Sequence, residues 1–271
     1  MVKLALGVKY RKKLVRLLVN SLRKSDAPPM FLCPFDMMGA QIMSEGLHER
    51  GYLDALISYL QGSIDALEER CFIDVGANIG NHAVFFSAYF SGGYAFEPMP
   101  LAHKIAEANL MMNGATDVRL FKVGLGEEAL DLPFWQENGN LGGSGFLPPS
   151  LRRDGRGTFD EIRCSIICGD DFEPLSSRNH RVGLVKIDVE GLETSVLRGL
   201  KRLLVADGPV VVFESHGDSG MEQIDLLRGL GYRHFSIISR RSLFGIFCDY
   251  KVQKVTKLQD DRMYPMVIAE L

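Results

Sequence analysis

The sequence predicts an α/β protein with a Rossmann-like parallel sheet. Short apolar segments alternate with helical segments from residue 71 onward, and this alternation is typical of a parallel sheet with helices on both faces. A glycine-containing turn follows the first apolar segment directly. With 271 residues, 46% of them hydrophobic, the chain is long enough to bury a large core. We therefore expect one main α/β domain with additions.

Composition excludes several other classes. The net charge of -3 gives no global electrostatic reason to expect a nucleic-acid partner, so none is expected. No apolar run reaches the roughly 18 residues of a membrane-spanning helix, and no signal peptide is recognisable. The five cysteines are odd in number and scattered, which predicts free thiols in a reducing, cytoplasmic setting. They are Cys33, Cys71, Cys164, Cys168 and Cys248.

The amino-terminal part reads as a helical cap over residues 1–70. Residues 1–24 hold eight Lys or Arg and no acid, with leucines at helical spacing, which predicts a basic amphipathic helix. Such a helix either packs on its own domain or makes peripheral contact with an anionic membrane. Prolines then interrupt the pattern, and a second helical pattern covers about Ile42 to Leu67. The main domain is expected over residues 71–271.

Within the main domain the predicted elements follow one another closely. Strands are expected at residues 71–75, 94–96, 118–123, 182–187 and 210–213, with closing strands near 233–238, 244–250 and 264–269 that are open to antiparallel pairing. Helices are expected at 81–89, 101–112, 192–204 and 221–230. Between the third and fourth strands, residues 130–172 lack helical periodicity and predict an insertion of short strands and loops. Within it, the glycine-rich segment 139–157 is either a surface hairpin or a lid over an acceptor.

The strongest functional signal is the turn after the first predicted strand. Phe72 to Asn81 reads FIDVGANIGN, and Gly76 and Gly80 there allow backbone to approach a ligand closely. Glu97 ends the next strand, 23 residues after Asp74, near the offset at which an acid binds a ribose diol. Taken alone, Glu97 would equally suit a helix start. Together, the two features predict a nucleoside cofactor.

The spacing of the glycines bears on which cofactor binds. A dinucleotide fingerprint that begins at Gly76 requires glycine at positions 78 and 81, where this chain has Asn78 and Asn81. Their side chains stand where a pyrophosphate needs bare backbone. This disfavours an NAD-dependent oxidoreductase. The same objection does not apply to a cofactor that has no phosphate.

These residues resemble the FkbM-type S-adenosylmethionine-dependent methyltransferases. The likeness extends over residues 70–216 and includes the Asp74 to Gly80 turn, Phe96-Glu97-Pro98, the segment from Lys186 to Gly191 and Phe213-Glu214. The resemblance implies a seven-stranded methyltransferase fold, S-adenosylmethionine as cofactor, and methylation of a hydroxyl on a sugar, glycan or small metabolite. One departure is Ala83, where similar proteins often have Thr or Ser.

The resemblance also implies roles for individual residues. It places Asp74, Gly76, Ala77, Asn78 and Gly80 at the methionine portion of the cofactor. It places Glu97 at the ribose, and Gly124 and Leu125 beside the adenine.

Transfer to an alcohol needs a base to accept the proton, and the ends of the fourth and fifth predicted strands supply four candidates. They are Asp188, Glu190, Glu214 and His216, of which His216 and Asp188 are favoured. Glu190 and Glu193 also suit a helix start. The same acids with His216 could hold Mg²⁺, which is the minority option.

Two other functions stay open at this point. One is N-methylation or transfer to another acceptor atom, which the cofactor motif does not distinguish. The other is a non-catalytic protein that binds S-adenosylmethionine or a glycan on the same fold. In each case the expected partner is a small molecule or glycan, and the sequence gives no oligomeric state.

Overall fold

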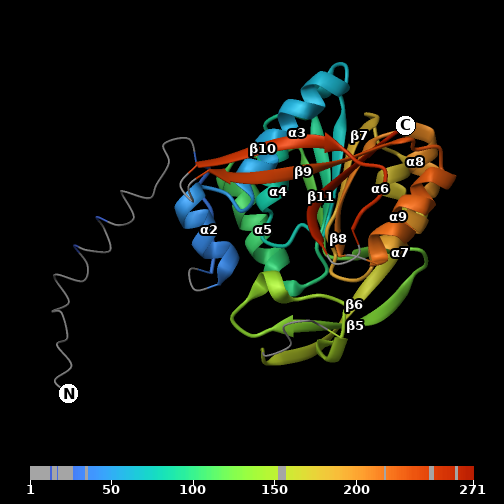
Figure 1. Ribbon diagram of the computed structural model, residues 1–271. Coiled ribbons are helices and arrows are strands. Elements are labelled where there is room, and N and C mark those ends of the chain that lie inside the picture. Colours follow the sequence, from blue (N-terminus) through green and yellow to red (C-terminus); the bar gives the residue numbers. More distant parts are fainter. Residues whose placement is uncertain are drawn as a thin grey trace.

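The structure, a computed structural model, describes residues 27–33, 36–151, 157–216, 218–243, 247–259 and 262–271, together with Lys13 and Leu17. Its centre is an eight-stranded sheet in the order β10-β9-β11-β8-β7-β1-β2-β3 (Figure 1). Five of these strands are mutually parallel: β1 Cys71–Val75, β2 Gly92–Phe96, β3 Val118–Phe121, β7 Val182–Ile187 and β8 Val210–His216. Three are antiparallel to their neighbours: β9 His234–Leu243, β10 Phe247–Lys254 and β11 Met263–Glu270.

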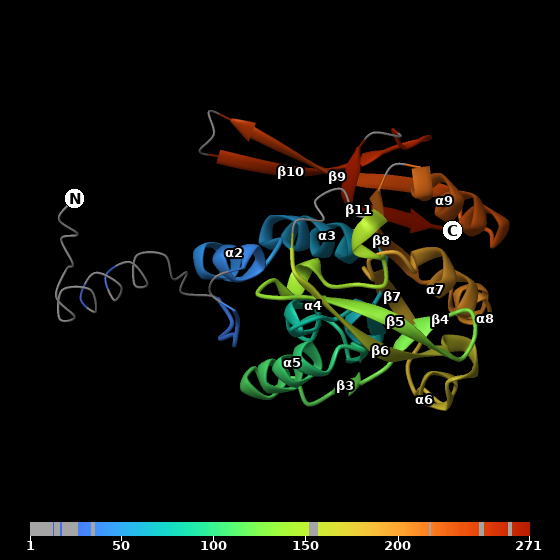
Figure 2. The same cartoon turned by 90° about the horizontal axis from the view of Figure 1, so that it is seen from below.

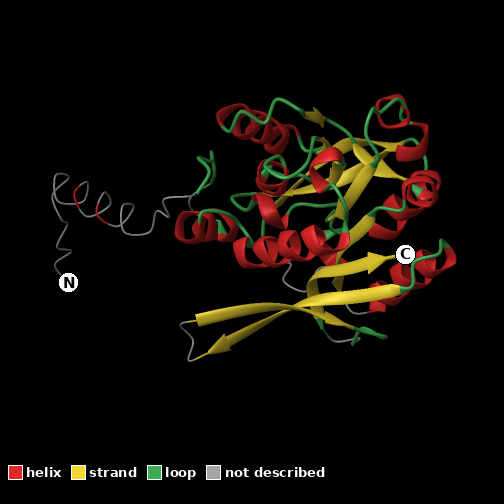
Figure 3. Cartoon of the chain, turned by 90° about the horizontal axis from the view of Figure 1, so that it is seen from above, coloured by secondary structure: helices red, strands yellow, loops and turns green. Residues whose placement is uncertain are grey.

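This sheet confirms the α/β, Rossmann-like fold. The central strands β1 and β7 are buried along their full length, as their apolar sequences require when helices cover both faces. The resemblance implied seven strands, and the sheet has eight because β10 folds back on β9 and extends the edge. Figure 3 shows this pair as two long strands that reach beyond the rest of the sheet.

Helices cover the two faces of the sheet and enclose separate apolar clusters (Figure 1). One face carries α3 Arg50–Ser63, α4 Asn81–Phe86 and α5 Pro100–Met112. The other carries α6 Glu173–Ser176, α7 Glu193–Gly199, α8 Lys201–Asp207 and α9 Asp218–Gly229. The helix expected over residues 192–204 is thus two short helices, α7 and α8.

The insertion between β3 and β7 forms a second, three-stranded sheet in the order β4-β6-β5 (Figure 2). Its strands are β4 Gly124–Gly126, β5 Leu130–Glu137 and β6 Phe159–Cys168. Phe134 of β5 and Cys164 of β6 join an apolar cluster with Ile79 and Met99, next to the ends of β1 and β2. The predicted strands and loops are therefore present, and the small sheet packs over the carboxyl edge of the main one.

The helical pattern expected from about Ile42 to Leu67 corresponds to two helices, separated by a break after Glu45. Asp36 caps α2 Met37–Glu45 by accepting a hydrogen bond from the backbone of Gly39, and Gly46 ends it in the left-handed conformation at φ +89°. After three more residues α3 begins and packs against β10, where Tyr52 and Tyr250 meet edge to face at 4.9 Å.

The basic helix expected over residues 1–24 lies outside the described residues apart from Lys13 and Leu17, and so does its predicted membrane contact. Within the part of the chain that is described, no helix is both long enough and apolar enough to cross a bilayer.

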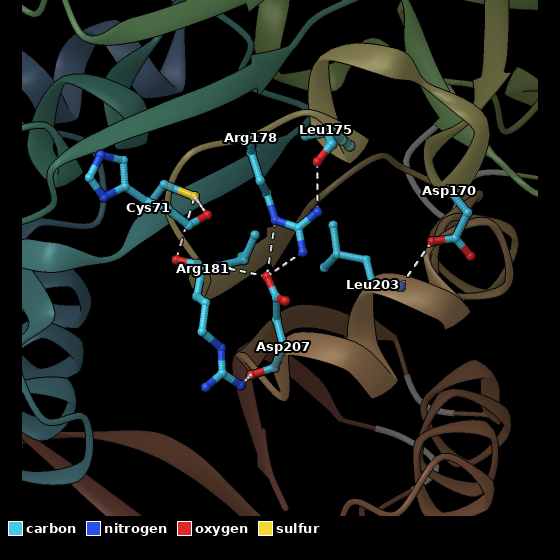
Figure 4. A network of polar contacts seen from close by, with 9 residues as sticks. Cys71, Asp170, Leu175, Arg178, Arg181, Leu203 and Asp207 are labelled. Carbon is cyan, nitrogen blue, oxygen red and sulfur yellow. Dashed lines mark hydrogen bonds and ion pairs between the residues drawn. The ribbon is translucent and has the colours of Figure 1, made fainter.

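The amino ends of β1 and β7 are closed by a polar network (Figure 4). The Asp207 carboxylate accepts from Arg178 Nε at 3.0 Å and Nη2 at 2.6 Å, and from the backbone of Val182 at 2.8 Å. Arg181 donates to the backbone carbonyl of Asp207 at 2.9 Å. The charges of Arg178 and Asp207 at this end of the sheet are therefore paired with each other.

Candidate functional site

The carboxyl ends of the parallel strands open into a cavity of about 360 Å³. This volume lies in the range of about 300–1,000 Å³ that small-molecule sites occupy. Glu97 after β2 and Glu214 of β8 stand at its two ends, with Ala77 after β1 and Asp188 after β7 between them. Three strand spacings separate β2 from β8, or roughly 14 Å. The cavity therefore extends along the ends of four neighbouring strands.

The turn after β1 follows a left-handed path at three positions. Gly76, Asn78 and Gly80 have φ values of +83°, +50° and +80°. A Cβ on Gly76 would stand 1.8 Å from the carbonyl oxygen of Asp188, and one on Gly80 would stand 3.2 Å from the backbone of Ala106. Glycine is therefore required at position 76 because the backbone of Asp188 lies too close for a side chain. At position 80, the backbone of Ala106 disfavours a side chain. In both cases the neighbouring protein backbone, and not only a ligand, is the reason.

Glu97 is held in one orientation at the cavity wall. Its Oε2 accepts from the backbone N–H of Asn78 at 2.8 Å, and its Oε1 accepts from the backbone N–H of Met99 at 2.8 Å. The side chain is 5% exposed, and burial raises the pKa of Glu97 to about 7 against the opposing effect of the two N–H groups. Each oxygen keeps a lone pair for a ligand, so the carboxylate can accept two more hydrogen bonds.

At the floor of the cavity lies a buried cation between two acids. Lys186 Nζ is 3.1 Å from Asp188 Oδ2 and 3.5 Å from Asp74 Oδ1. Burial alone would lower the pKa of Lys186, but the two carboxylates outweigh it and the pKa is raised. Burial would likewise raise the pKa of Asp188, but the charges of Lys186 and His82 and hydrogen bonds with Lys186 and Glu214 lower it. Asp188 is thus an ionised, paired group.

A polar cluster from outside the strands forms a further part of the cavity wall. His48 and Glu49 come from the break between α2 and α3, and His82 from α4. Asn81 fixes the break, because its Oδ1 accepts from the backbone N–H of His48 at 2.9 Å and its Nδ2 donates to the carbonyl of His48 at 3.0 Å. His82 Nε2 lies 3.5 Å from Glu49 Oε2.

The glycine-rich segment covers the cavity. Asn140, Leu141, Gly142, Gly143, Ser144 and Phe146 line it. Asn78 Nδ2 donates to the carbonyl of Leu141 at 3.3 Å, and the backbone of Leu147 donates to the carbonyl of Glu190 at 3.1 Å. Of the two alternatives for this segment, its placement favours the lid, although residues 152–156 lie outside the described part.

The structure brings many of the predicted site residues together at the cavity and leaves others behind it. Those that line it are Gly76, Ala77, Asn78, Glu97, Asp188, Glu190 and Glu214. Asp74 is fully buried beneath it against Lys186, and Gly80 packs on α5. Gly124 and Leu125, expected beside the adenine, lie buried in β4, and the neighbouring Pro98 and Phe146 line the cavity instead. His216 ends β8, but its side chain lies outside the described part.

Sequence reasoning missed His48, Glu49, His82 and Lys186 as site residues. The sequence contained a feature that could have identified Lys186, because a lone cation in an otherwise apolar strand needs a buried partner. For His48 the only such feature was weak, namely the glycine at position 46, which interrupts a helical pattern. Across the described residues, no three His, Cys, Asp or Glu side chains are grouped to hold a metal ion, and the side chain of His216, one of the ligands of the Mg²⁺ option, lies outside them.

Comparison with known proteins identifies the family. The profile of the Methyltransferase FkbM domain matches residues 74–234, more than half of the chain. The protein belongs to the FkbM methyltransferase family. Its fold also matches the crystal structure of methyltransferase FkbM from Methylobacillus flagellatus KT, with a TM-score of 0.50, 15% identity and coverage of 96% of this chain.

Two curated fungal proteins are similar to this FkbM-family chain. Methyltransferase sdnD of Sordaria araneosa is 30% identical over 158 residues, which is 47% of this chain. Methyltransferase 1 of Beauveria bassiana is 24% identical over 200 residues, which is 68% of this chain. The chain spans 59% of the Sordaria araneosa protein, 76% of the Beauveria bassiana protein and 59% of the Methylobacillus flagellatus chain.

Proposed function

We propose that the protein is an S-adenosylmethionine-dependent methyltransferase that methylates a hydroxyl group of a sugar, glycan or small metabolite. The observation that carries this proposal is Glu97, whose carboxylate is oriented by two backbone N–H groups at the wall of a cavity over β1 and β2. A carboxylate with a free lone pair on each oxygen suits the two hydroxyls of a ribose. Family membership supports the choice of cofactor.

The charges of the cavity also suit this cofactor. Its ionisable lining includes the acids Glu49, Glu97, Asp188, Glu190 and Glu214, whereas Lys186 is the only lysine or arginine among the described lining residues. A negative lining favours a sulfonium cation and disfavours a pyrophosphate. Asn78 and Asn81 use their side chains to bind Leu141 and His48, in positions that a dinucleotide would need bare.

The bound cofactor supplies an electrophilic methyl group on sulfur. The chain must then hold the acceptor in line with that methyl group and exclude water. The glycine-rich segment contributes to the exclusion of water, because its residues from Asn140 to Phe146 cover the cavity. With the ribose at the β2 end, the acceptor lies toward the β8 end, where carboxylates and imidazoles can accept hydrogen bonds from hydroxyls. Acidic groups there disfavour anionic acceptors.

The first test is calorimetric titration with S-adenosylmethionine and S-adenosylhomocysteine. We expect binding to wild type and about 10- to 100-fold weaker binding to Glu97→Ala, the loss of hydrogen bonds to a charged group. Glu107→Ala, at an exposed acid of α5, is the matched control and should bind normally. Absence of binding to the folded wild type would remove the proposal.

The second test is transfer of tritium from methyl-labelled S-adenosylmethionine. Neutral methyl glycosides, uronic acids and primary amines are compared, and we expect product with the neutral glycosides. Product only with amines would make the protein an N-methyltransferase. Cofactor binding without product from any acceptor would favour a non-catalytic binding protein.

A further inference from the structure

The His48 imidazole occupies a place in the cavity that cofactor binding does not explain. It enters from the break between α2 and α3, outside the strand ends that hold the turn and Glu97. Its charged surroundings include Lys186 and Asp188 from β7. His48 therefore lies toward the part of the cavity that the acceptor would occupy.

The backbone around His48 is held in a costly conformation. Glu49 has φ +58°, and its side chain makes no capping hydrogen bond to α3. A left-handed conformation is unfavourable for such a residue and persists only where the surroundings impose it. Asn81 imposes it by binding both backbone groups of His48, and Asn81 is itself 4% exposed. The turn that would meet the cofactor thereby fixes the position of His48.

The imidazole itself is placed to accept a proton. Among the described residues, no group forms a hydrogen bond with His48 Nδ1, although this atom is buried. Burial lowers the pKa of His48, as do the nearby charges of His82 and Lys186, against the opposing effects of Glu49 and Asp188. A lowered pKa favours the neutral ring, which is the form that can accept a proton. Glu49 and His82 pair with each other beside it.

We propose that His48 is the general base of the methyl transfer, with Asn81 as its positioning residue. The acceptor oxygen bonds to the methyl carbon, the electron pair of the broken carbon–sulfur bond stays on sulfur, and the hydroxyl proton passes to the His48 imidazole and then to solvent. This inference rests on the proposed function. It replaces Asp188, whose pairing with Lys186 and lowered pKa make it a weak base.

The first test is ¹⁵N NMR of the histidine rings in the wild-type complex with S-adenosylhomocysteine, which needs no acceptor. His48→Asn assigns the His48 signals. We expect the His48 ring to be neutral at pH 7.5, and addition of methyl α-D-glucopyranoside to shift its ¹⁵N signals. A ring that is protonated at pH 7.5, or one that no probe glycoside shifts, would overturn the proposal.

The second test measures transfer and binding by variants. Because asparagine keeps a polar side chain but cannot accept a proton, His48→Asn should bind S-adenosylhomocysteine within about twofold of wild type yet transfer about 100-fold more slowly or worse. His103→Asn is the matched control, since His103 lies on α5 away from the cavity and its pKa is also lowered by burial. Wild-type rates in His48→Asn would overturn the base assignment alone. If the wild-type protein does not bind S-adenosylhomocysteine, the proposed function itself is wrong.

Discussion

The two ends of the parallel strands treat buried charge differently. At the amino end, Asp207 accepts three hydrogen bonds from Arg178 and Val182 (Figure 4). At the carboxyl end, within the described residues, both carboxylate oxygens of Asp74, His48 Nδ1 and His82 Nε2 are buried without a hydrogen bond. Polar groups that only stabilise a fold are usually satisfied. The two ends therefore differ in how completely their buried polar groups are hydrogen-bonded.

The largest expected effect comes from removing the cation at the carboxyl end. Lys186→Met leaves Asp74, which is fully buried, without its counter-charge, and we expect a loss of about 3–5 kcal/mol in the free energy of unfolding. Urea denaturation measures it. The double variant Lys186→Met with Asp74→Asn should recover part of the loss. A loss below about 1 kcal/mol would show that burial of Asp74 does not depend on the charge of Lys186.

A smaller loss of stability is expected from a substitution at the amino end, and it should not change ligand binding. Arg178→Ala removes two hydrogen bonds from Asp207, so we expect a loss of about 1.5–3 kcal/mol in stability with unchanged affinity for S-adenosylhomocysteine. Arg202→Ala, which breaks the exposed pair with Asp171, is the control and should cost about 1 kcal/mol or less. Weakened cofactor binding in Arg178→Ala would mean that the two ends are coupled.

The smallest effect is a pH dependence confined to the carboxyl end. Burial raises the pKa of Glu97 to about 7, so the fraction able to accept two ribose hydroxyls grows between pH 6 and pH 8. Affinity for S-adenosylhomocysteine should therefore rise about tenfold over this interval, as calorimetry at several pH values would measure. Glu97→Gln should flatten the profile. An affinity that falls with pH would contradict the assigned role of Glu97.

The local parts of the site could be predicted from the sequence. The buried strand β1, its turn and Glu97 are close in the sequence, and their residue types limit the backbone to few conformations. The cavity therefore lies beside the turn and Glu97, where the sequence predicted a cofactor site. The reason for Gly76 could not be predicted, because the group that excludes a side chain is the carbonyl of Asp188, more than a hundred residues away.

The acceptor end could not be predicted in the same way. His48 reaches the cavity only because the helical pattern from Ile42 breaks after Gly46, and Glu49 then adopts a conformation that its own side chain disfavours. Both depend on Asn81, which comes from a different element and contacts backbone rather than a side chain. A contact that a side chain makes with backbone does not depend on the residue type of its partner, so it cannot be recognised in the sequence. The sequence therefore favoured Asp188 and His216 as the base.

The position of β11 sets the order in which the main sheet can be completed. It lies between β8 and β9, although it follows both in the chain. The matched segment 74–234 does not include it. During synthesis, β8 and β9 each expose an unpaired edge until residues 263–270 have emerged, and such edges invite pairing with other chains. The nascent protein is thus most prone to aggregate just before β11 joins the sheet.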